Sequence, residues 1–181
     1  MYVEAIKTVS SFTRPMLTII RRYGSTTVEP HCATIFFVNE EGCAVTCKHV
    51  VLNLFADVND KYAEFKKEKE GFGESAKKFN KRLRDLEKRY AYDNTTIVSI
   101  KNRFQDCVEN LEIEEIKMHE TEDLAYIKFK NWKNLHYKGH AVFLEDSNEA
   151  VSGKSLCRLG YPFAEYSNFK YNEEKDEIEW T

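Results

Sequence analysis

The sequence predicts a mainly β protein, with an antiparallel barrel or sandwich that is interrupted by a helical segment. Several short runs of β-branched and aromatic residues, separated by polar or glycine-containing links, indicate the strands. One long stretch in which apolar residues recur every three or four positions indicates the helices. With 181 residues, 42% of them hydrophobic, the chain can form one domain and part of another.

The clearest β pattern is a pair of runs, Thr34–Asn39 and Cys43–Thr46, joined by the polar link Glu40-Glu41-Gly42. The second run leads directly to His49, just past the expected end of its strand. A strand end is a rigid place from which to present a side chain to a cleft. Because histidine gains and loses a proton near neutral pH, this position suits a proton-transfer group.

After His49 the hydrophobic period changes from that of a strand to that of a helix. From residue 57 to 92 the apolar positions follow a helical stripe, formed by Tyr62, Phe65, Phe72, Ala76, Phe79, Leu83, Leu86 and Tyr90. Gly71 and Gly73 interrupt it, and a glycine costs about 1 kcal/mol inside a helix. We therefore expect two helices, arranged as a hairpin-like insertion over 57–92.

The insertion is dense in charge, which fits either a solvated helical face or a docking arm for a partner protein. Its basic stretch from Lys77 to Arg84 also raises the possibility of contact with nucleic acid. The whole chain has a net charge of −3, however, and lacks the positive excess that such binding needs. We expect no nucleic-acid partner.

β character returns after the insertion, and the two ends of the chain are less regular. The expected later strands are Thr95–Lys101, Leu111–Met118, Leu124–Phe129, Ala141–Leu144 and Ser155–Leu159. Residues 1–22 have helix-compatible spacing that Pro15 would close. Near the other end, Phe169, Tyr171, Ile178 and Trp180 have the character of strand residues.

Three segments together carry a family resemblance. The run from Phe36 to Val51, with its Gly42 turn and the motif Thr46-Cys47-Lys48-His49-Val50, resembles the trypsin-like (chymotrypsin-fold) serine peptidases, in the disulfide-free style of bacteria. The segment Glu122-Asp123-Leu124-Ala125-Tyr126-Ile127 is similar to the one that holds their acidic triad member. Gly160-Tyr161-Pro162 is similar to a Gly-Tyr-Pro near the start of their second barrel.

The resemblance implies a six-stranded trypsin-like barrel over 1–140, which contains the insertion, and the beginning of an incomplete second barrel over 141–181. It also implies that His49 is the general base and that Asp123 orients it, in a hydrolase that cleaves protein substrates through a seryl intermediate. No Gly-Asp-Ser-Gly-Gly segment occurs in the sequence. The expected function is thus the N-terminal part of an intracellular serine endopeptidase, with the nucleophilic serine supplied by a C-terminal half or by a partner chain.

Several alternatives stay open. Glu122 competes with Asp123 for the orienting role, and Ser155 is a weak candidate nucleophile. Cys43, Cys47 and His49 have spacings that raise the possibility of zinc, but a second close pair of ligands is missing. We expect no metal and no cofactor. The alternative function is a non-catalytic protein-interaction module that holds partners through the insertion.

The remaining features concern the compartment. No apolar run reaches 18 residues, so no membrane span is expected, and the first twenty residues lack the continuous apolar core of a signal peptide. The cysteines are scattered and odd in number: Cys32, Cys43, Cys47, Cys107 and Cys157. Relatives that are secreted usually place a disulfide cysteine after the histidine, where this chain has Val50. We therefore expect free thiols and a cytoplasmic location.

Overall fold

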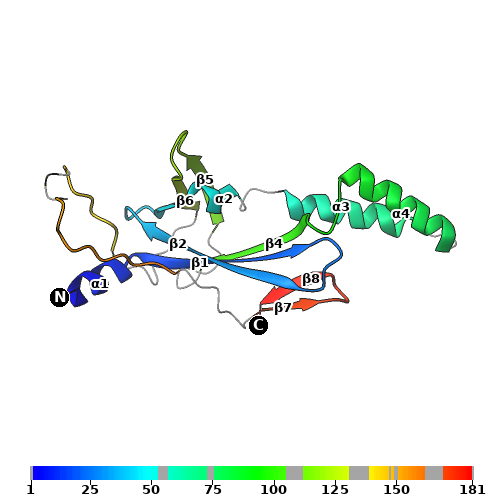
Figure 1. Ribbon diagram of the computed structural model, residues 1–181, viewed down its shortest axis with the longest axis horizontal. Helices are drawn as coiled ribbons and strands as arrows, with labels where there is room; N and C mark the ends of the chain where they lie inside the picture. Colours follow the sequence, from blue (N-terminus) through cyan, green and yellow to red (C-terminus); the bar gives the residue numbers. More distant parts are fainter. Residues whose placement is uncertain are drawn as a thin grey trace. The chain divides into compact units, whose positions relative to one another are not determined.

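The computed structural model describes residues 2–52, 57–72, 76–104, 112–130, 139–146, 148, 151–161 and 169–180 (Figure 1). Its helices are α1 Val3–Ser10, α2 Lys48–Leu52, α3 Val58–Glu70 and α4 Ala76–Tyr90. Its strands are β1 Thr13–Arg22, β2 Val28–Phe37, β3 Cys43–Thr46, β4 Ile97–Phe104, β5 Glu112–Met118, β6 Ala125–Lys130, β7 Phe169–Asn172 and β8 Glu177–Trp180.

Six of these strands form one antiparallel sheet in the order β4-β1-β2-β3-β6-β5, which curls into a half-barrel. The prediction of a mainly β protein is confirmed. The described strands do not close into the complete barrel that the sequence predicted. The predicted run Cys43–Thr46 matches β3 at both ends, and four other predicted strands overlap β2, β4, β5 and β6.

The helix-compatible spacing in residues 1–22 is confirmed for α1, which ends at Ser10, before Pro15. The strand β1, which contains Pro15, was not predicted. Every residue of β1 from Thr13 to Arg21 is buried, so neither face of the strand is exposed to solvent and the sequence does not alternate between apolar and polar residues. The segments Ala141–Leu144 and Ser155–Leu159 are not strands. Their apolar side chains are largely exposed, since none of the described strands pairs with these two segments.

The described chain forms two compact units that are interleaved along the sequence. One unit comprises residues 1–17, 32–52 and 103–164, and the other comprises 18–31, 53–102 and 165–181. The domain boundaries expected from the family resemblance, 1–140 and 141–181, stay a prediction. Each unit has a hydrophobic core of its own.

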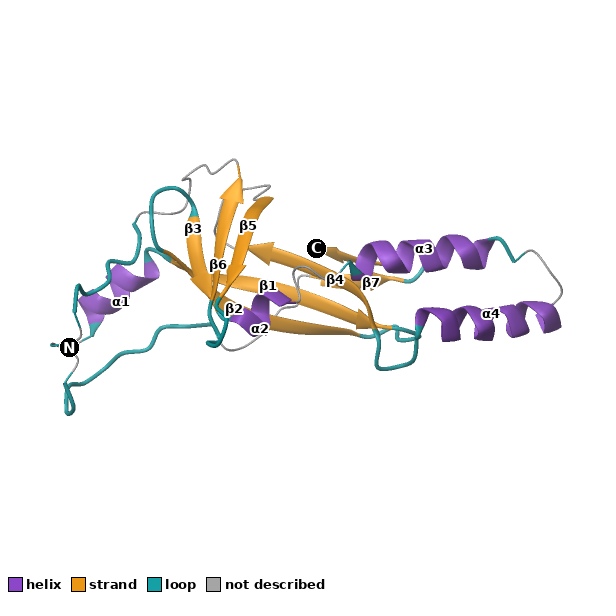
Figure 2. Cartoon of the chain, turned by 90° about the horizontal axis from the view of Figure 1, so that it is seen from above, coloured by secondary structure: helices purple, strands orange, loops and turns teal. Residues whose placement is uncertain are grey.

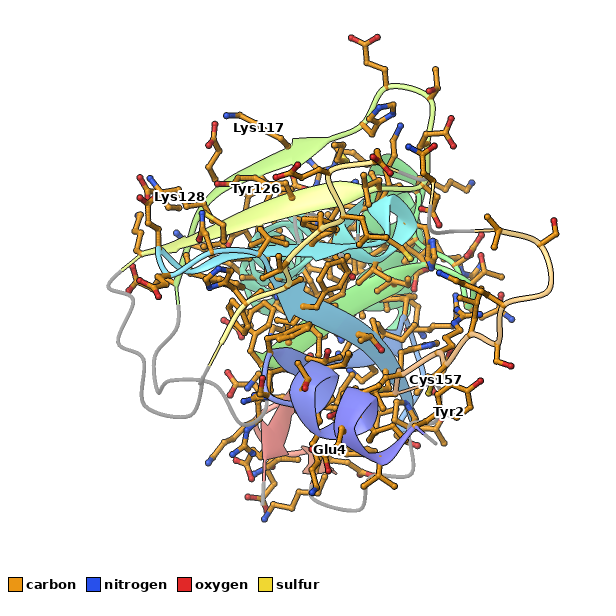
Figure 3. All side chains as sticks on the ribbon, turned by 90° about the vertical axis from the view of Figure 1, so that its left-hand side faces the viewer. Tyr2, Glu4, Lys117, Tyr126, Lys128 and Cys157 are labelled. Atoms are coloured by element: carbon orange, nitrogen blue, oxygen red, sulfur yellow. The ribbon has the colours of Figure 1, made fainter. Side chains whose placement is uncertain are left out.

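In the first unit, β3 and the β5–β6 hairpin surround buried residues that include Phe37, Ile127 and Phe129. The Phe37 and Phe129 rings lie 6.2 Å apart between centroids. On the outer surface of the hairpin, Lys117 of β5 and Lys128 of β6 extend away from the strands (Figure 3). Lys128 pairs with Glu114 at 3.1 Å across the two strands, so charge covers this face while apolar side chains fill the other.

In the second unit, α3 and α4 lie side by side as an antiparallel hairpin, as predicted for the insertion (Figures 1 and 2). The predicted stripe supplies its packing, because Phe65 and Leu86 are almost fully buried and contact Tyr92 and Val98. Four further aromatic rings and one leucine of this unit pack against that cluster. Helix α3 ends at Glu70 with Gly71 as its C-cap, which agrees with the predicted break; Gly73 lies outside the described residues.

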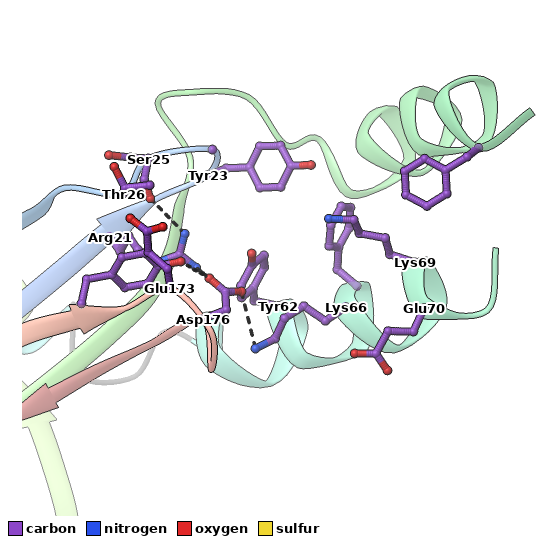
Figure 4. Close-up of a pocket in the computed structure, with 14 residues that line it drawn as sticks. Arg21, Tyr23, Ser25, Thr26, Tyr62, Lys66, Lys69, Glu70, Glu173 and Asp176 are labelled. Carbon is purple, nitrogen blue, oxygen red and sulfur yellow. Dashed lines mark hydrogen bonds and ion pairs between the residues drawn. The ribbon is translucent and has the colours of Figure 1, made fainter. Parts of the chain in front are cut away.

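The second unit also contains the two-stranded sheet of β7 and β8, in which Ile178 is fully buried. Next to it lies a pocket of about 680 Å³ (Figure 4). The Arg21 side chain is only 3% exposed there and lies against the rings of Tyr62 and Tyr171, at 5.2 and 4.8 Å from their centroids. Arg21 Nη2 is 2.6 Å from Asp176 Oδ1. Arg21 Nη2 makes no aligned hydrogen bond, so charge attraction is the main force that holds this pair together.

Candidate active site

The position of His49 follows from the strand before it. β3 lies between β2 and β6 in the sheet, and its last residue, Thr46, donates a hydrogen bond from Oγ1 to the carbonyl of Thr34 at 2.8 Å. The chain then turns at Cys47 into the short helix α2, which is anchored by the fully buried Val51. His49 lies on the exposed side of this helix, with 69% of its side chain accessible.

The position of Asp123 follows from the turn between β5 and β6. That turn is closed by a hydrogen bond from the His119 amide to the carbonyl of Leu124 at 2.8 Å. In the β3–β6 register, Thr46 is paired with Ala125. The end of β3 therefore lies opposite the start of β6, and this places His49 and Asp123 together although they are 74 residues apart in sequence.

The two residues make two hydrogen bonds. The backbone N–H of His49 donates to Asp123 Oδ1 at 2.9 Å, and His49 Nδ1 lies 2.6 Å from Asp123 Oδ2. An ionised carboxylate only accepts hydrogen bonds, so the proton of the neutral imidazole lies on Nδ1 and the lone pair on Nε2. The backbone N–H and then the ring of His49 hold the pKa of Asp123 below its usual value. The carboxylate is therefore ionised at neutral pH.

A cleft of about 530 Å³ lies beside His49. It is lined by Cys32, Ala33, Thr34, Thr46, Cys47, His49, Val50, Arg158, Gly160 and Tyr161. The backbone N–H of Tyr161 donates to Thr34 Oγ1 at 2.8 Å, which fixes the Gly160-Tyr161 segment against β2. A Cβ atom on Gly160 would lie 3.3 Å from the same oxygen, so glycine permits this close approach. Pro162, the third residue of the motif, lies outside the described residues.

Cys43 and Cys47 lie in different surroundings, which their spacing in the sequence did not reveal. Cys43 is buried on β3, with Sγ 2.7 Å from the hydroxyl of Tyr126, and this contact raises the pKa of Tyr126 to about 12. Cys47 instead lies with His49 and Asp123. Partial burial, together with the Asp123 carboxylate, raises the pKa of the Cys47 thiol, so it is protonated at neutral pH rather than a thiolate nucleophile.

The other candidate residues lie apart from this pair. In the turn between β5 and β6, Glu122 donates its backbone N–H to His119 Nδ1 at 3.0 Å, while it is Asp123 that bonds to His49. Ser155 is exposed and is not among the described residues that line the cleft. His31 is exposed and His140 is half-buried; His136 and Cys107 lie outside the described residues.

The fold and this site define a mainly β protein with an exposed histidine–aspartate pair, which lies where strand β3 of the curled, half-barrel sheet ends. No family model matches the chain, and neither curated proteins nor solved structures provide a match. Within the described residues, no helix has the length and apolar character needed to cross a membrane.

Proposed function

We propose that this chain is the N-terminal part of a trypsin-like serine endopeptidase, in which His49 is the general base and Asp123 orients it. The observation that carries the proposal is the double hydrogen bond between these residues, with Nδ1 on Oδ2 at 2.6 Å and the backbone N–H on Oδ1 at 2.9 Å. The nucleophilic serine and the donors that stabilise the oxyanion come from outside this chain, and the substrates are proteins.

The geometry supports a defined division of labour. Asp123 accepts from Nδ1–H and so keeps the lone pair on Nε2, the nitrogen that would take a proton from an incoming serine hydroxyl. As that proton arrives, the imidazolium is stabilised by the nearby carboxylate charge. The same Nε2–H then protonates the leaving amine. The cleft beside His49 gives a polypeptide room on one side of the ring.

A fluorophosphonate probe tests the proposal, because it reacts covalently with serines that a histidine base activates. A protein that contains this sequence together with its complementary half or partner chain is expected to be labelled. Labelling should be lost in His49→Ala and kept in His31→Ala, a matched change of another exposed histidine. Labelling that survives in His49→Ala, or that never occurs, would contradict the proposal.

The second candidate is a non-catalytic module that holds a partner through the helical insertion. One observation favours it: the exposed residues Lys81, Arg84 and Lys88 of α4 line a hollow of about 470 Å³. Asn80 and Asp85 line it too, so three positive charges face one negative charge there. Such a basic face fits an acidic protein surface. Charge reversal at Lys81 and Arg84 would weaken that partner's binding, whereas for the peptidase it would leave fluorophosphonate labelling unchanged.

A further inference from the structure

Cys47 lies next to the histidine–aspartate pair and gives the site a third kind of ligand. One atom from each of Cys47, His49 and Asp123 can be chosen so that all three lie within 4.8 Å of one another. Cys47 directly precedes α2, His49 lies in its first turn, and Asp123 comes from the turn before β6. We propose that these three side chains bind Zn²⁺, and that the bound ion blocks His49 as a base.

The ligand set has the chemistry that zinc prefers. Thiolate, imidazole nitrogen and carboxylate oxygen bind Zn²⁺ at about 2.3, 2.0–2.1 and 2.0–2.2 Å, and three protein ligands with an open fourth position make a common zinc site. In a tetrahedral site of this kind the ligand atoms lie roughly 3–4 Å apart. Zinc binding would therefore move His49 Nδ1 and Asp123 Oδ2, now 2.6 Å apart, away from each other and bring the Cys47 sulfur closer to them by up to about 1 Å. Exposed side chains achieve such changes by rotation.

The site combines these groups more closely than the rest of the described chain does. Among the residues that the structure describes, no other group of three cysteine, histidine or acidic side chains comes this close together. Cys157 is also an exposed free thiol, but it is not part of such a group. The candidate zinc ligands therefore differ from those that the sequence spacing indicated. Asp123 takes the place of Cys43, whose side chain is buried.

One nearby charge opposes the ion. Arg158 lines the same cleft and is close enough to Cys47 to interact with its charge. A guanidinium at this position weakens cation binding but favours the thiolate that the metal needs. The site is thus expected to bind zinc less tightly than a closed structural site does, as suits an ion that binds and leaves.

Metal binding changes where the imidazole proton lies. When Cys47 coordinates Zn²⁺ it releases its thiol proton to solvent. When Nδ1 coordinates, the single N–H of the neutral ring moves to Nε2. Nε2 then has no lone pair with which to accept a proton from a hydroxyl. This consequence for activity rests on the proposed function, whereas the metal site itself does not.

Cobalt(II) titration of the purified, reduced chain tests the site directly, since Co²⁺ occupies zinc sites and shows a sulfur-to-cobalt charge-transfer absorption when a thiolate binds it. We expect this band in the unmodified chain, and expect zinc to displace it. Cys47→Ala should abolish the band and weaken cobalt binding by more than about 100-fold, because loss of an outer-shell partner alone typically costs 10–100-fold. The matched thiol variant Cys157→Ala should keep both.

Two further variants complete the test. Asp123→Asn should weaken cobalt binding and shift the band, and Arg158→Gln should strengthen binding. Absence of a sulfur-to-cobalt band in the unmodified chain would overturn the proposal, as would a band that persists in Cys47→Ala. Cobalt binding in a protein that fluorophosphonate never labels would support the metal site and contradict the proposed peptidase. Labelling in a protein that does not bind cobalt would support the peptidase and contradict the metal site.

Discussion

Replacing Asp176 by asparagine should destabilise the second unit by isolating a buried positive charge. Arg21 is 3% exposed and its Nη2 lies 2.6 Å from Asp176 Oδ1. Asp176 also has a positive φ of 52°, a conformation that asparagine tolerates as well as aspartate does. Asp176→Asn therefore removes the charge without adding backbone strain.

The size of the effect follows from the surroundings of the pair. Removing one partner of a buried ion pair typically costs 3–5 kcal/mol. The Asp176 side chain is 25% exposed, so water screens part of its charge. Arg21 also keeps its contacts with the two tyrosine rings and its hydrogen bond to the Ser25 carbonyl. We therefore expect a loss of about 2–4 kcal/mol in the free energy of unfolding.

Urea denaturation followed by circular dichroism measures this loss. With a slope of about 1–3 kcal/mol per molar urea, the midpoint should fall by roughly 1 M or more. The matched control is Glu177→Gln, which neutralises the next, exposed carboxylate and should change the free energy by less than about 0.5 kcal/mol. Equal effects of the two variants would refute the importance of the Arg21–Asp176 pair.

The same pair predicts a pH dependence. Burial alone would raise the pKa of Asp176, but the hydroxyls of Tyr171 and Tyr62 and the charges of Arg21 and Lys66 outweigh it and hold the pKa below its usual value. A lowered pKa in the folded state contributes stability that is complete above the unfolded value of about 3.9 and is lost as the pH falls through the folded value. The stability difference between the wild type and Asp176→Asn should therefore shrink below about pH 4. A difference that stays constant down to pH 2 would contradict this account.

Three other predictions concern the cores and the site. Phe65→Ala should cost about 3–5 kcal/mol in unfolding free energy because the ring is 1% exposed, whereas the half-buried Phe79→Ala should cost clearly less; equal losses would contradict the assigned core. Gly160→Ala should cost about 1–3 kcal/mol, because its Cβ would press on Thr34 Oγ1; an unchanged urea midpoint would show that Thr34 yields freely. Asp123→Asn should remove the strongly deshielded Nδ1–H signal of His49 from the proton NMR spectrum, since the charged acceptor is lost, while Glu122→Gln should keep it. Persistence of the signal in Asp123→Asn would mean that Nδ1 bonds elsewhere.

The hydrophobic pattern of the sequence predicted those strands and helices that have one apolar face and one polar face. β3 was predicted at both ends because Gly42 and the residues after Thr46 bound a short apolar run. The helical hairpin was predicted because its stripe alternates steps of three and four. β1 was missed because burial on both faces removes the alternation. Ala141–Leu144 was predicted as a strand from composition alone, and composition does not reveal whether a neighbouring strand is there to pair with it.

The sequence also predicted only part of the candidate site. His49 and Asp123 were selected by motif, and the hydrogen bond between them follows from the β3–β6 register, which only the three-dimensional pairing reveals. Their catalytic roles stay a prediction. The place of Cys47 beside Asp123 had no signal in the sequence beyond its two-residue spacing from His49. The spacing of Cys43 pointed to the same cluster, but the side chain is directed to Tyr126 instead.

The pairing of Thr46 with Ala125 sets where His49 and Asp123 meet, and neither of these residues belongs to the insertion. The length of α3 and α4 is therefore free to vary without altering this meeting point. Shortening the hairpin by whole helical turns at its tip, beyond the core residues Phe65 and Leu86, should leave the His49–Asp123 hydrogen bonds in place. The His49–Asp123 pair is thus independent of the tip of the α3–α4 hairpin. Other segments can be attached at this tip without changing the pair.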